Sequence, residues 1–167
     1  NMDKHIFLHR GIVSNKYKEN SYRGIKESIN FIKKNKTIAN GLEIDVCITR
    51  DNKFIVYHPK PKRFRAKIDT DYTDYYKMKH KEPQIFLFKK LLPIIKKNAE
   101  VMFLIDLKLA PYQRKIKNII MSFIIESNKN QNIRFLVCGK IIFNWLEKEK
   151  IPYIYMLHTI KHSRVNL

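Results

Sequence analysis

Six short segments of the chain are almost continuously apolar and of strand length, which predicts buried strands. They cover residues 5–8, 41–48, 53–57, 101–108, 132–138 and 152–157. Longer segments between them carry apolar residues at helical spacing, and we predict helices there. These helices cover residues 22–36, 85–97, 111–124 and 139–150.

Helices and strands alternate along the chain, except where a tight turn at residues 49–52 joins two strands directly. This order is typical of an α/β domain with a mainly parallel sheet covered by helices. Neither an internal repeat nor a linker rich in proline and glycine divides the chain, so we expect one domain over residues 1–167. The basic, tyrosine-rich residues 60–82 lack a clean period and are expected to form a long loop, with room for a short helix.

The formal net charge is +19, which favours anionic partners such as phosphate esters, nucleic acid or a membrane surface. The basic residues are nevertheless spread from Lys4 to Arg164, whereas a nucleic-acid interface would cluster them. We therefore interpret most lysines as solvated surface and keep an anionic membrane surface as an open alternative. A nucleic-acid-binding module that uses the lysines and tyrosines of residues 60–81 is a weaker alternative.

The two cysteines, Cys47 and Cys138, lie in apolar runs without metal-ligand spacing, so we expect reduced core residues. No apolar run reaches the roughly 20 residues that cross a bilayer. The first residues also lack the pattern of a signal peptide. These observations together lead us to expect a cytoplasmic location.

Polar and ionisable side chains gather where four of the predicted strands end. They are His9, Arg10, Glu43, Asp45, His58, Asp106 and Lys108. The carboxyl ends of parallel strands share one face of an α/β domain, and ligands bind there. We therefore expect these seven side chains to line a common site.

Glu43 and Asp45 are two residues apart in an apolar strand, so both side chains point to one face of the sheet. Buried carboxylates are costly unless a cation or hydrogen-bond donors satisfy them. The pair therefore indicates a metal site. A half-exposed strand edge that carries solvated acids is the alternative.

Most of these residues belong to motifs that occur together, in the same order, in one enzyme family. The motifs are His9-Arg10-Gly11, Glu19-Asn20-Ser21, Glu43-Ile44-Asp45-Val46, Thr49-Arg50-Asp51-Asn52, His58 and Asp106-Leu107-Lys108. In this order and strand context, residues 5–108 resemble the glycerophosphodiester phosphodiesterases. The remainder of the chain resembles that family only in its alternation of elements.

The resemblance implies a TIM-type (β/α) barrel. Such a barrel has eight strands and at least about 200 residues, whereas this chain has 167 residues and six predicted strands. We therefore expect an α/β fold with an incomplete barrel, about six of the eight strands, that is C-terminally truncated relative to the family. A remnant whose sheet stays open is the other interpretation of the same shortage.

The resemblance also implies a metal-ligand set, in which Glu43, Asp45 and Asp106 would bind a divalent cation. Ligands that are all oxygen atoms suit Mg²⁺ or Ca²⁺. Two positions depart from the family pattern. Asp106 stands where a glutamate is usual, and Pro59 stands where an aspartate generally follows the second histidine.

For catalysis, the resemblance implies that His9 and His58 act as general acid and base, in an order that the sequence leaves open. Arg10 and Lys108 would hold the phosphate oxygens as charged donors. The expected function is metal-dependent hydrolysis of glycerophosphodiesters to an alcohol and glycerol phosphate. Its substrate would be a small phosphodiester, and nucleic acid is not an expected partner.

A catalytically inactive family remnant, or a binding-only fragment with an incomplete barrel, is the alternative function. It rests on the missing strands and on Pro59. The sequence leaves the diester, the choice between the two ions and the oligomeric state open.

Overall fold

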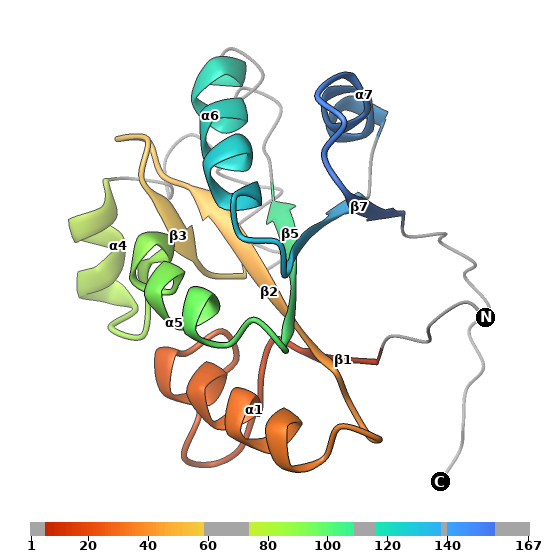
Figure 1. Cartoon of the computed structure of the whole chain (residues 1–167). Coiled ribbons are helices and arrows are strands. Elements are labelled where there is room, and N and C mark those ends of the chain that lie inside the picture. The colour runs from red at the N-terminus through yellow and green to blue at the C-terminus, as the bar shows by residue number, and fades with distance from the viewer. Residues whose placement is uncertain (1–5, 59–73, 109–115, 138–139, 156–167) are drawn as a thin grey trace, which may run out of the picture.

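A computed structural model describes residues 6–58, 74–108, 116–137 and 140–155 of the chain (Figure 1). The strands are β1 (Phe7–His9), β2 (Gly41–Ile48), β3 (Phe54–Val56), β4 (Phe86–Leu87), β5 (Met102–Lys108), β6 (Ile133–Val137) and β7 (Tyr153–Tyr155). The helices are α1 (Tyr22–Lys34), α4 (Tyr75–Lys81), the 3-10 turn η1 (Phe88–Lys90), α5 (Leu92–Lys97), α6 (Lys117–Asn128) and α7 (Lys140–Lys148).

A single sheet forms the centre of the described structure, with the strand order β4-β3-β2-β5-β6-β7 and with β1 also paired to β2. The pairs of β2 with β1 and β5, and of β6 with β5 and β7, are parallel. Only β3 and β4 run antiparallel to their neighbours. The mainly parallel α/β sheet predicted from the sequence is therefore confirmed.

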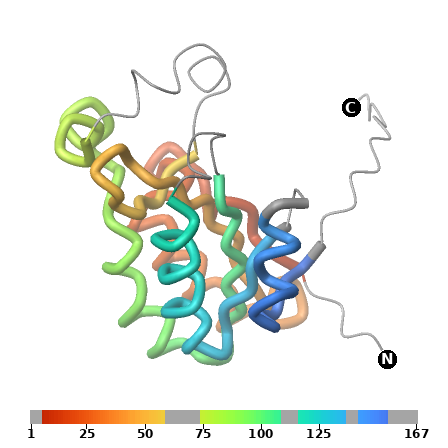
Figure 2. The backbone as a smooth tube through the Cα atoms, turned by 90° about the horizontal axis from the view of Figure 1, so that it is seen from above, coloured from red at the N-terminus to blue at the C-terminus, as the bar shows by residue number. Residues whose placement is uncertain are grey.

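The helices α1, α5, α6 and α7 cover one face of this sheet, and their apolar side chains form the main core with it. Leu42, Ile44 and Val46 of β2 point into that core and are fully buried. In Figure 2, α6 and α7 lie on the same side of the sheet, whereas α4 stands at the opposite end of the molecule. The core residues of α4 belong to a second, smaller cluster with Cys47 and Ile55.

The strand β2 is the most fully paired strand of the sheet. β5 pairs with it from Gly41 to Cys47 and so occupies one whole edge. β1 pairs in parallel with residues 41–43, and β3 pairs antiparallel with residues 46–48. Because a strand has only two edges, β1 and β3 share the other edge of β2, one on each half of it.

The helix predicted over residues 85–97 is wrong in its first half. Residues 86–87 form the strand β4, which pairs with β3, and the helix α5 begins only at Leu92. Pro93 explains the late start, because proline lacks an N–H group and fits the first turn of a helix but not its interior. Residues 86–87 form a strand because they pair with the edge of β3, and the spacing of apolar residues along the sequence does not reveal such a pairing.

The short helix expected within residues 60–82 is α4, at the end of that segment. Residues 59–73, including Pro59, lie outside the described structure. The same holds for residues 109–115, where the helix that leads into α6 was predicted to start, and for Cys138 and the last residues from 156. Cys47 is buried and forms no disulfide, as predicted.

The incomplete-barrel prediction is confirmed in part. The described fold is α/β, and its sheet has seven strands. This is one strand more than predicted, because the sequence analysis missed β4. It runs from β4 to β7 without closing on itself among these residues. None of the described helices is long and apolar enough to cross a membrane.

The fully buried Ile44 tests this description of the core. We expect Ile44→Ala to lower the free energy of unfolding by about 2–5 kcal/mol, because it leaves a cavity between the sheet and its helices. Ile38→Ala is the matched control, since Ile38 is 55% exposed, and it should cost less than about 0.5 kcal/mol. Urea unfolding of the two variants measures both, and equal losses would contradict the core assignment.

Candidate active site

Three carboxylates meet on the face of the sheet that lies opposite the main core. Glu43 and Asp45 come from β2, and Asp106 comes from β5, where it pairs directly with Asp45 in the strand register. One oxygen of each carboxylate lies within 4.8 Å of the others, and all three side chains are buried. The structure brings together the three residues expected to bind a cation, and their role as ligands stays a prediction.

Two cations partly neutralise this acidic cluster. The Arg10 guanidinium places Nε 3.1 Å from Oδ2 of Asp45. The Lys108 ammonium lies 3.3 Å from Oδ1 of Asp45 and donates a hydrogen bond to Asp106. With all three carboxylates ionised, the two cations leave a net negative charge at the cluster, which favours binding of a further cation. Within the described structure, Oδ1 of Asp45 and Nε of Arg10 are buried without a hydrogen bond of good geometry.

The burial of like charges changes the pKa of Glu43. Desolvation, the neighbouring charge of Asp45 and then that of Asp106 raise this pKa to about 7. The hydrogen bond that the Arg10 N–H donates to Oε2 of Glu43, over 3.0 Å, acts in the opposite direction. Without a further cation, Glu43 is therefore about half protonated near neutral pH.

Asn20 contacts the acidic cluster, although the sequence analysis assigned it no role beyond its place in the motif Glu19-Asn20-Ser21. Its side-chain amide donates to Oδ2 of Asp45 over 2.8 Å, and its Oδ1 accepts the N–H of Asp45 over 3.1 Å. It is buried in the left-handed conformation (φ 54°), which asparagine tolerates better than most residues. The next residue, Ser21, caps helix α1. Asn20 instead orients a carboxylate.

Arg10 and Gly11 make the turn that brings the basic group to the carboxylates. Both adopt positive φ angles, 57° and 80°, and a Cβ atom at Gly11 would lie 3.2 Å from Oγ of Ser28. The Arg10 side chain then reaches both Asp45 and Glu19, whose Oε2 accepts a hydrogen bond from it over 3.1 Å. The turn follows β1 directly and directs Arg10 inward, towards Asp45.

The two histidines reach the site from opposite directions along one edge of β2. His9 ends β1 opposite Glu43, with Nε2 3.8 Å from Oε2 of Glu43 and a side chain that is 71% exposed. His58 follows β3, whose next residue, Tyr57, donates its N–H to the carbonyl of Asp45. His58 therefore reaches the site because β3 runs antiparallel to β2. The prediction that all four strand ends meet through parallel pairing is wrong for β3.

Burial and charge also shift the pKa of two other groups in the site. Desolvation lowers the pKa of His58, and the charges of Arg10 and Lys108 add to that effect against the opposing charge of Asp45. For Lys108, desolvation acts to lower the pKa, but its hydrogen bond to Asp106 and the nearby carboxylates raise it overall. His58 is therefore mostly neutral at neutral pH, and Lys108 stays charged.

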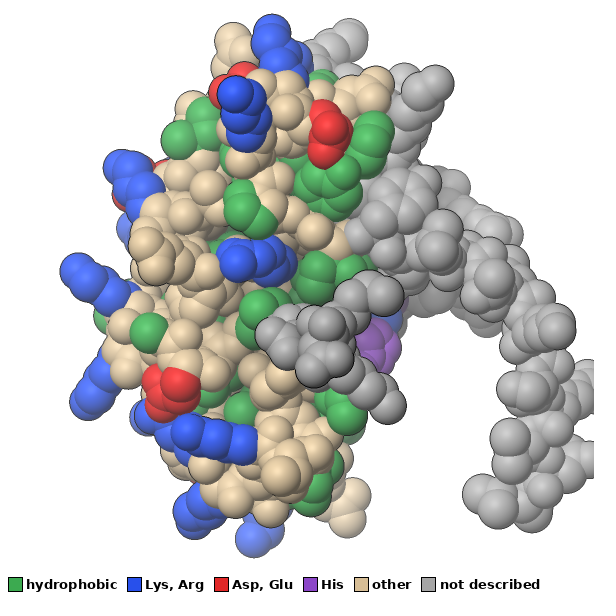
Figure 3. Space-filling model, turned by 45° about the vertical axis from the view of Figure 1, so that its right-hand side comes forward, with side chains coloured by type: hydrophobic (Ala, Val, Ile, Leu, Met, Phe, Trp, Pro, Cys, Tyr) green, Lys and Arg blue, Asp and Glu red, His purple; other side chains and the backbone are tan. Residues whose placement is uncertain are grey.

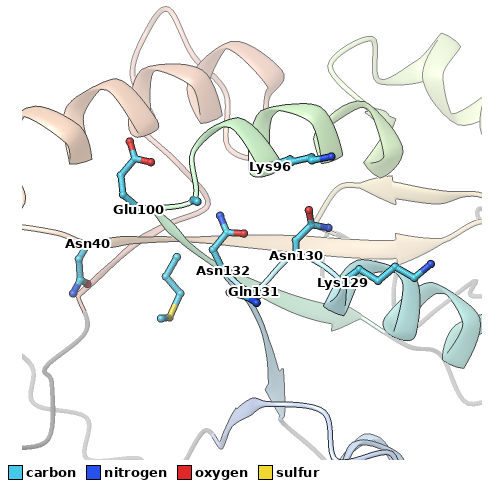
Figure 4. Close-up of a pocket in the computed structure, with 9 residues that line it drawn as sticks. Asn40, Lys96, Glu100, Lys129, Asn130, Gln131 and Asn132 are labelled. Carbon is cyan, nitrogen blue, oxygen red and sulfur yellow. The ribbon is translucent and has the colours of Figure 1, made fainter.

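A hollow of about 370 Å³, which we call the mouth, borders the site through Asn20 and His58. Glu19, Asn20, Tyr57 and His58 line one part of the mouth, and Val13, Glu82 and Gln84 line another. A separate hollow of about 540 Å³ lies at the opposite ends of the strands, lined by Asn40, Lys96, Glu100 and Asn132 among others (Figure 4). There the Asn132 amide is already used, since it donates to three backbone carbonyls.

Comparison with known proteins gives a likeness of structure but not of sequence. No family model and no curated protein matches the chain. Solved glycerophosphodiester phosphodiesterases from three organisms do match it. They come from Thermotoga maritima (TM-score 0.59, 24% identity over 96% of this chain), Parabacteroides distasonis (0.68, 17%, 89%) and Agrobacterium tumefaciens (0.58, 12%, 89%).

The fold resembles that of glycerophosphodiester phosphodiesterases. The family resemblance noted in the sequence is therefore confirmed at the level of structure. The chain spans 65%, 63% and 65% of the lengths of these three proteins, less than two thirds of each. A TIM-like architecture follows from the likeness, whereas a closed barrel does not.

A divalent cation fits the acidic cluster by its chemistry. The three carboxylates are all hard oxygen donors, and the buried Oδ1 of Asp45 has an ion-pair contact with Lys108 but no hydrogen bond among the described residues. Oxygen ligands of this kind suit Mg²⁺ and Ca²⁺. A metal site at this point is therefore chemically consistent with the structure, and the identity of the ion stays a prediction.

The raised pKa of Glu43 predicts a pH-dependent difference between the chain and Glu43→Gln, both free of metal. Folded Glu43 holds its proton more tightly than the unfolded chain does, so this group's contribution to stability falls as the pH rises from about 4.5 to above 7. Glu43→Gln lacks this titration. Between pH 4.5 and pH 8, its free energy of unfolding should therefore rise by about 2–3 kcal/mol relative to that of the natural chain. Urea unfolding at both pH values measures this gain, and a constant difference would contradict the shift.

Asn20→Ala tests the orienting role of Asn20. We expect metal affinity to fall about 10–100-fold, because an outer-shell partner fixes the carboxylate that would bind the ion. Ser21→Ala is the matched control, since it removes only the helix cap and should cost about 0.5–2 kcal/mol of stability without a comparable loss of affinity. Calorimetric titration with Mg²⁺ or Ca²⁺ compares the two, and equal affinities would contradict the role.

Proposed function

We propose that the chain catalyses the metal-dependent hydrolysis of a glycerophosphodiester to an alcohol and glycerol phosphate. The observation that carries this proposal is the buried cluster of Glu43, Asp45 and Asp106, with two cations inside it and two histidines at its edge. Phosphodiester cleavage needs neutralised phosphate oxygens, a proton acceptor and a proton donor. The likeness to glycerophosphodiester phosphodiesterases supports the same choice of reaction.

Glu43, Asp45 and Asp106 would hold the divalent cation, Mg²⁺ or Ca²⁺. When bound, such an ion polarises a phosphoryl oxygen and offsets the charge that develops in the transition state. Asn20 keeps Asp45 in place for this role, through two hydrogen bonds. Asp106, one carbon shorter than the usual glutamate, reaches the cluster because it pairs with Asp45 across two adjacent strands.

Arg10 and Lys108 are the groups that would bind the phosphate. Both already contact Asp45, so each is held in place on the site before a substrate arrives. Charged donors bind phosphate oxygens more strongly than neutral donors do. Their second partners, Glu19 for Arg10 and Asp106 for Lys108, fix the direction in which each cation points.

The proton transfers would belong to the two histidines. Neutral His58, whose pKa is lowered, accepts a proton from the attacking water molecule as the oxygen of that water forms the new P–O bond. His9, beside Glu43 and open to solvent, donates a proton to the leaving alkoxide as the old P–O bond breaks. The products are an alcohol and a phosphomonoester. This order of acid and base follows from burial, which the sequence does not reveal.

Turnover tests the proposal directly. We expect the purified chain to hydrolyse glycerophosphocholine in the presence of Mg²⁺ or Ca²⁺, and His9→Ala and His58→Ala each to lower kcat by about 10²–10⁴-fold. His80→Ala is the matched control, since His80 is exposed on α4 and does not line the mouth. Full activity in either of the first two variants would contradict the assignment.

A binding-only protein is the second candidate, and one observation favours it. The described sheet does not close into a barrel, and an open sheet leaves a strand edge for pairing with another chain. Such a protein would bind the cation without turning over any diester. Metal binding without turnover would support this candidate, and turnover by the chain would exclude it.

A further inference from the structure

A second hollow, of about 570 Å³, lies beside the mouth, and we call it the basic pocket. The basic pocket and the mouth are lined in common by Lys18 and Gln84. A ligand that enters the mouth can therefore extend into the basic pocket without leaving the surface of the protein. The proposed function assigns no role to this pocket.

All the charged residues that line the basic pocket are cations. Its cations come from four different parts of the chain and are Lys16, Lys18, Arg23, Lys79 and Lys90. They are five of the eleven lining residues, against 34 Lys and Arg among 167 residues in the chain. None of the eleven is Asp or Glu. On the face that Figure 3 shows, by contrast, acidic side chains lie close to several of the lysines and arginines.

The five cations of the basic pocket are not neutralised by neighbouring acidic side chains among the described residues. Among the described residues, none of the five forms an ion pair with a carboxylate, although Lys79 lies over the ring of Tyr75. The carboxylates nearest in the lining of the mouth have other partners. Glu19 accepts a hydrogen bond from Arg10, and Glu82 accepts one from Gln84. Mutual repulsion within the basic pocket therefore favours an anion.

The floor of the basic pocket is apolar and well packed. Ile85 and Phe86 are buried, and the Tyr22 ring meets the Phe86 ring edge to face, with centroids 5.4 Å apart. Tyr22 and Arg23 also begin the 13-residue helix α1, whose first turn carries no acid, so the positive end of the helix dipole adds to the field. Packed apolar residues and several cations therefore line the same pocket, and this combination suits a compact, highly charged group such as a phosphate.

We propose that the basic pocket binds a phosphomonoester group of the substrate, so that the site prefers a phosphodiester that carries a second, terminal phosphate. This inference rests on the proposed function for the diester and on the basic pocket alone for the second phosphate. The diester would lie at the acidic cluster against Arg10 and Lys108, its chain would pass through the mouth, and the terminal phosphate would lie among the five cations.

A charge-matched pair of variants tests the binding step. Lys79→Gln/Lys90→Gln removes two cations from the basic pocket. Lys77→Gln/Lys89→Gln removes the same charge from exposed positions of the same two elements that do not line it. Titration of the metal-free protein with inorganic phosphate, followed by ³¹P NMR, should show roughly five- to tenfold weaker binding for the first variant only. Equal weakening in both variants would overturn the proposal, because it would show a general effect of net charge.

Activity and membrane measurements separate the remaining outcomes. We expect the first variant to raise KM for a glycerophosphodiester with a terminal phosphate, with kcat and the hydrolysis of bis(p-nitrophenyl) phosphate unchanged. Phosphatidylcholine vesicles that contain phosphatidic acid are the second arm. Binding of the vesicles without binding of free phosphate would overturn the substrate assignment in favour of a lipid surface. Pocket-dependent phosphate binding without turnover of any diester would support the basic pocket and contradict the proposed function instead.

Discussion

The burial of three carboxylates on one face of the sheet is the constraint on which the rest of the site depends. Like charges within 4.8 Å of one another, removed from water, are unfavourable unless cations and donors surround them. Here Arg10, Lys108 and the Asn20 amide surround the carboxylates. They do not offset the whole free-energy cost of burying three charges, because the pKa of Glu43 is still raised. A divalent cation would offset this cost, which is why the cluster is better suited to binding than to stability.

The strand β2 organises the site through both of its edges. On one edge, the full-length pairing with β5 sets Asp106 beside Asp45. On the other edge, β1 and β3 approach from opposite directions and end at the level of the carboxylates. His9 ends β1 with its imidazole next to Glu43, and His58 follows Tyr57, whose backbone N–H donates to the carbonyl of Asp45. The site therefore needs the antiparallel β3 as much as the parallel strands.

Charge is distributed on two scales. The net charge of +19 is spread widely over the surface, where solvated lysines contribute little to stability or specificity. In the basic pocket, by contrast, cations from separate elements converge on one hollow without intervening acids. The basic pocket shares Lys18 and Gln84 with the mouth, and Asn20 and His58 link the mouth to the acidic cluster, an arrangement that suits the substrate with two phosphates proposed above.

Much of the fold and the site follows from the sequence alone, because it depends on local spacing. Alternation places Glu43 and Asp45 on one face, apolar runs define β2, β5 and β6, and the ordered motifs indicate the family resemblance. Only the tertiary structure decides what depends on contacts between distant segments. Register brings Asp106 to Asp45, an antiparallel return brings His58, Asn20 clamps a carboxylate 25 residues away, and β4 replaces a predicted helix because β3 has a free edge. Burial then sets the pKa values, since desolvation is a property of the packed molecule rather than of the sequence.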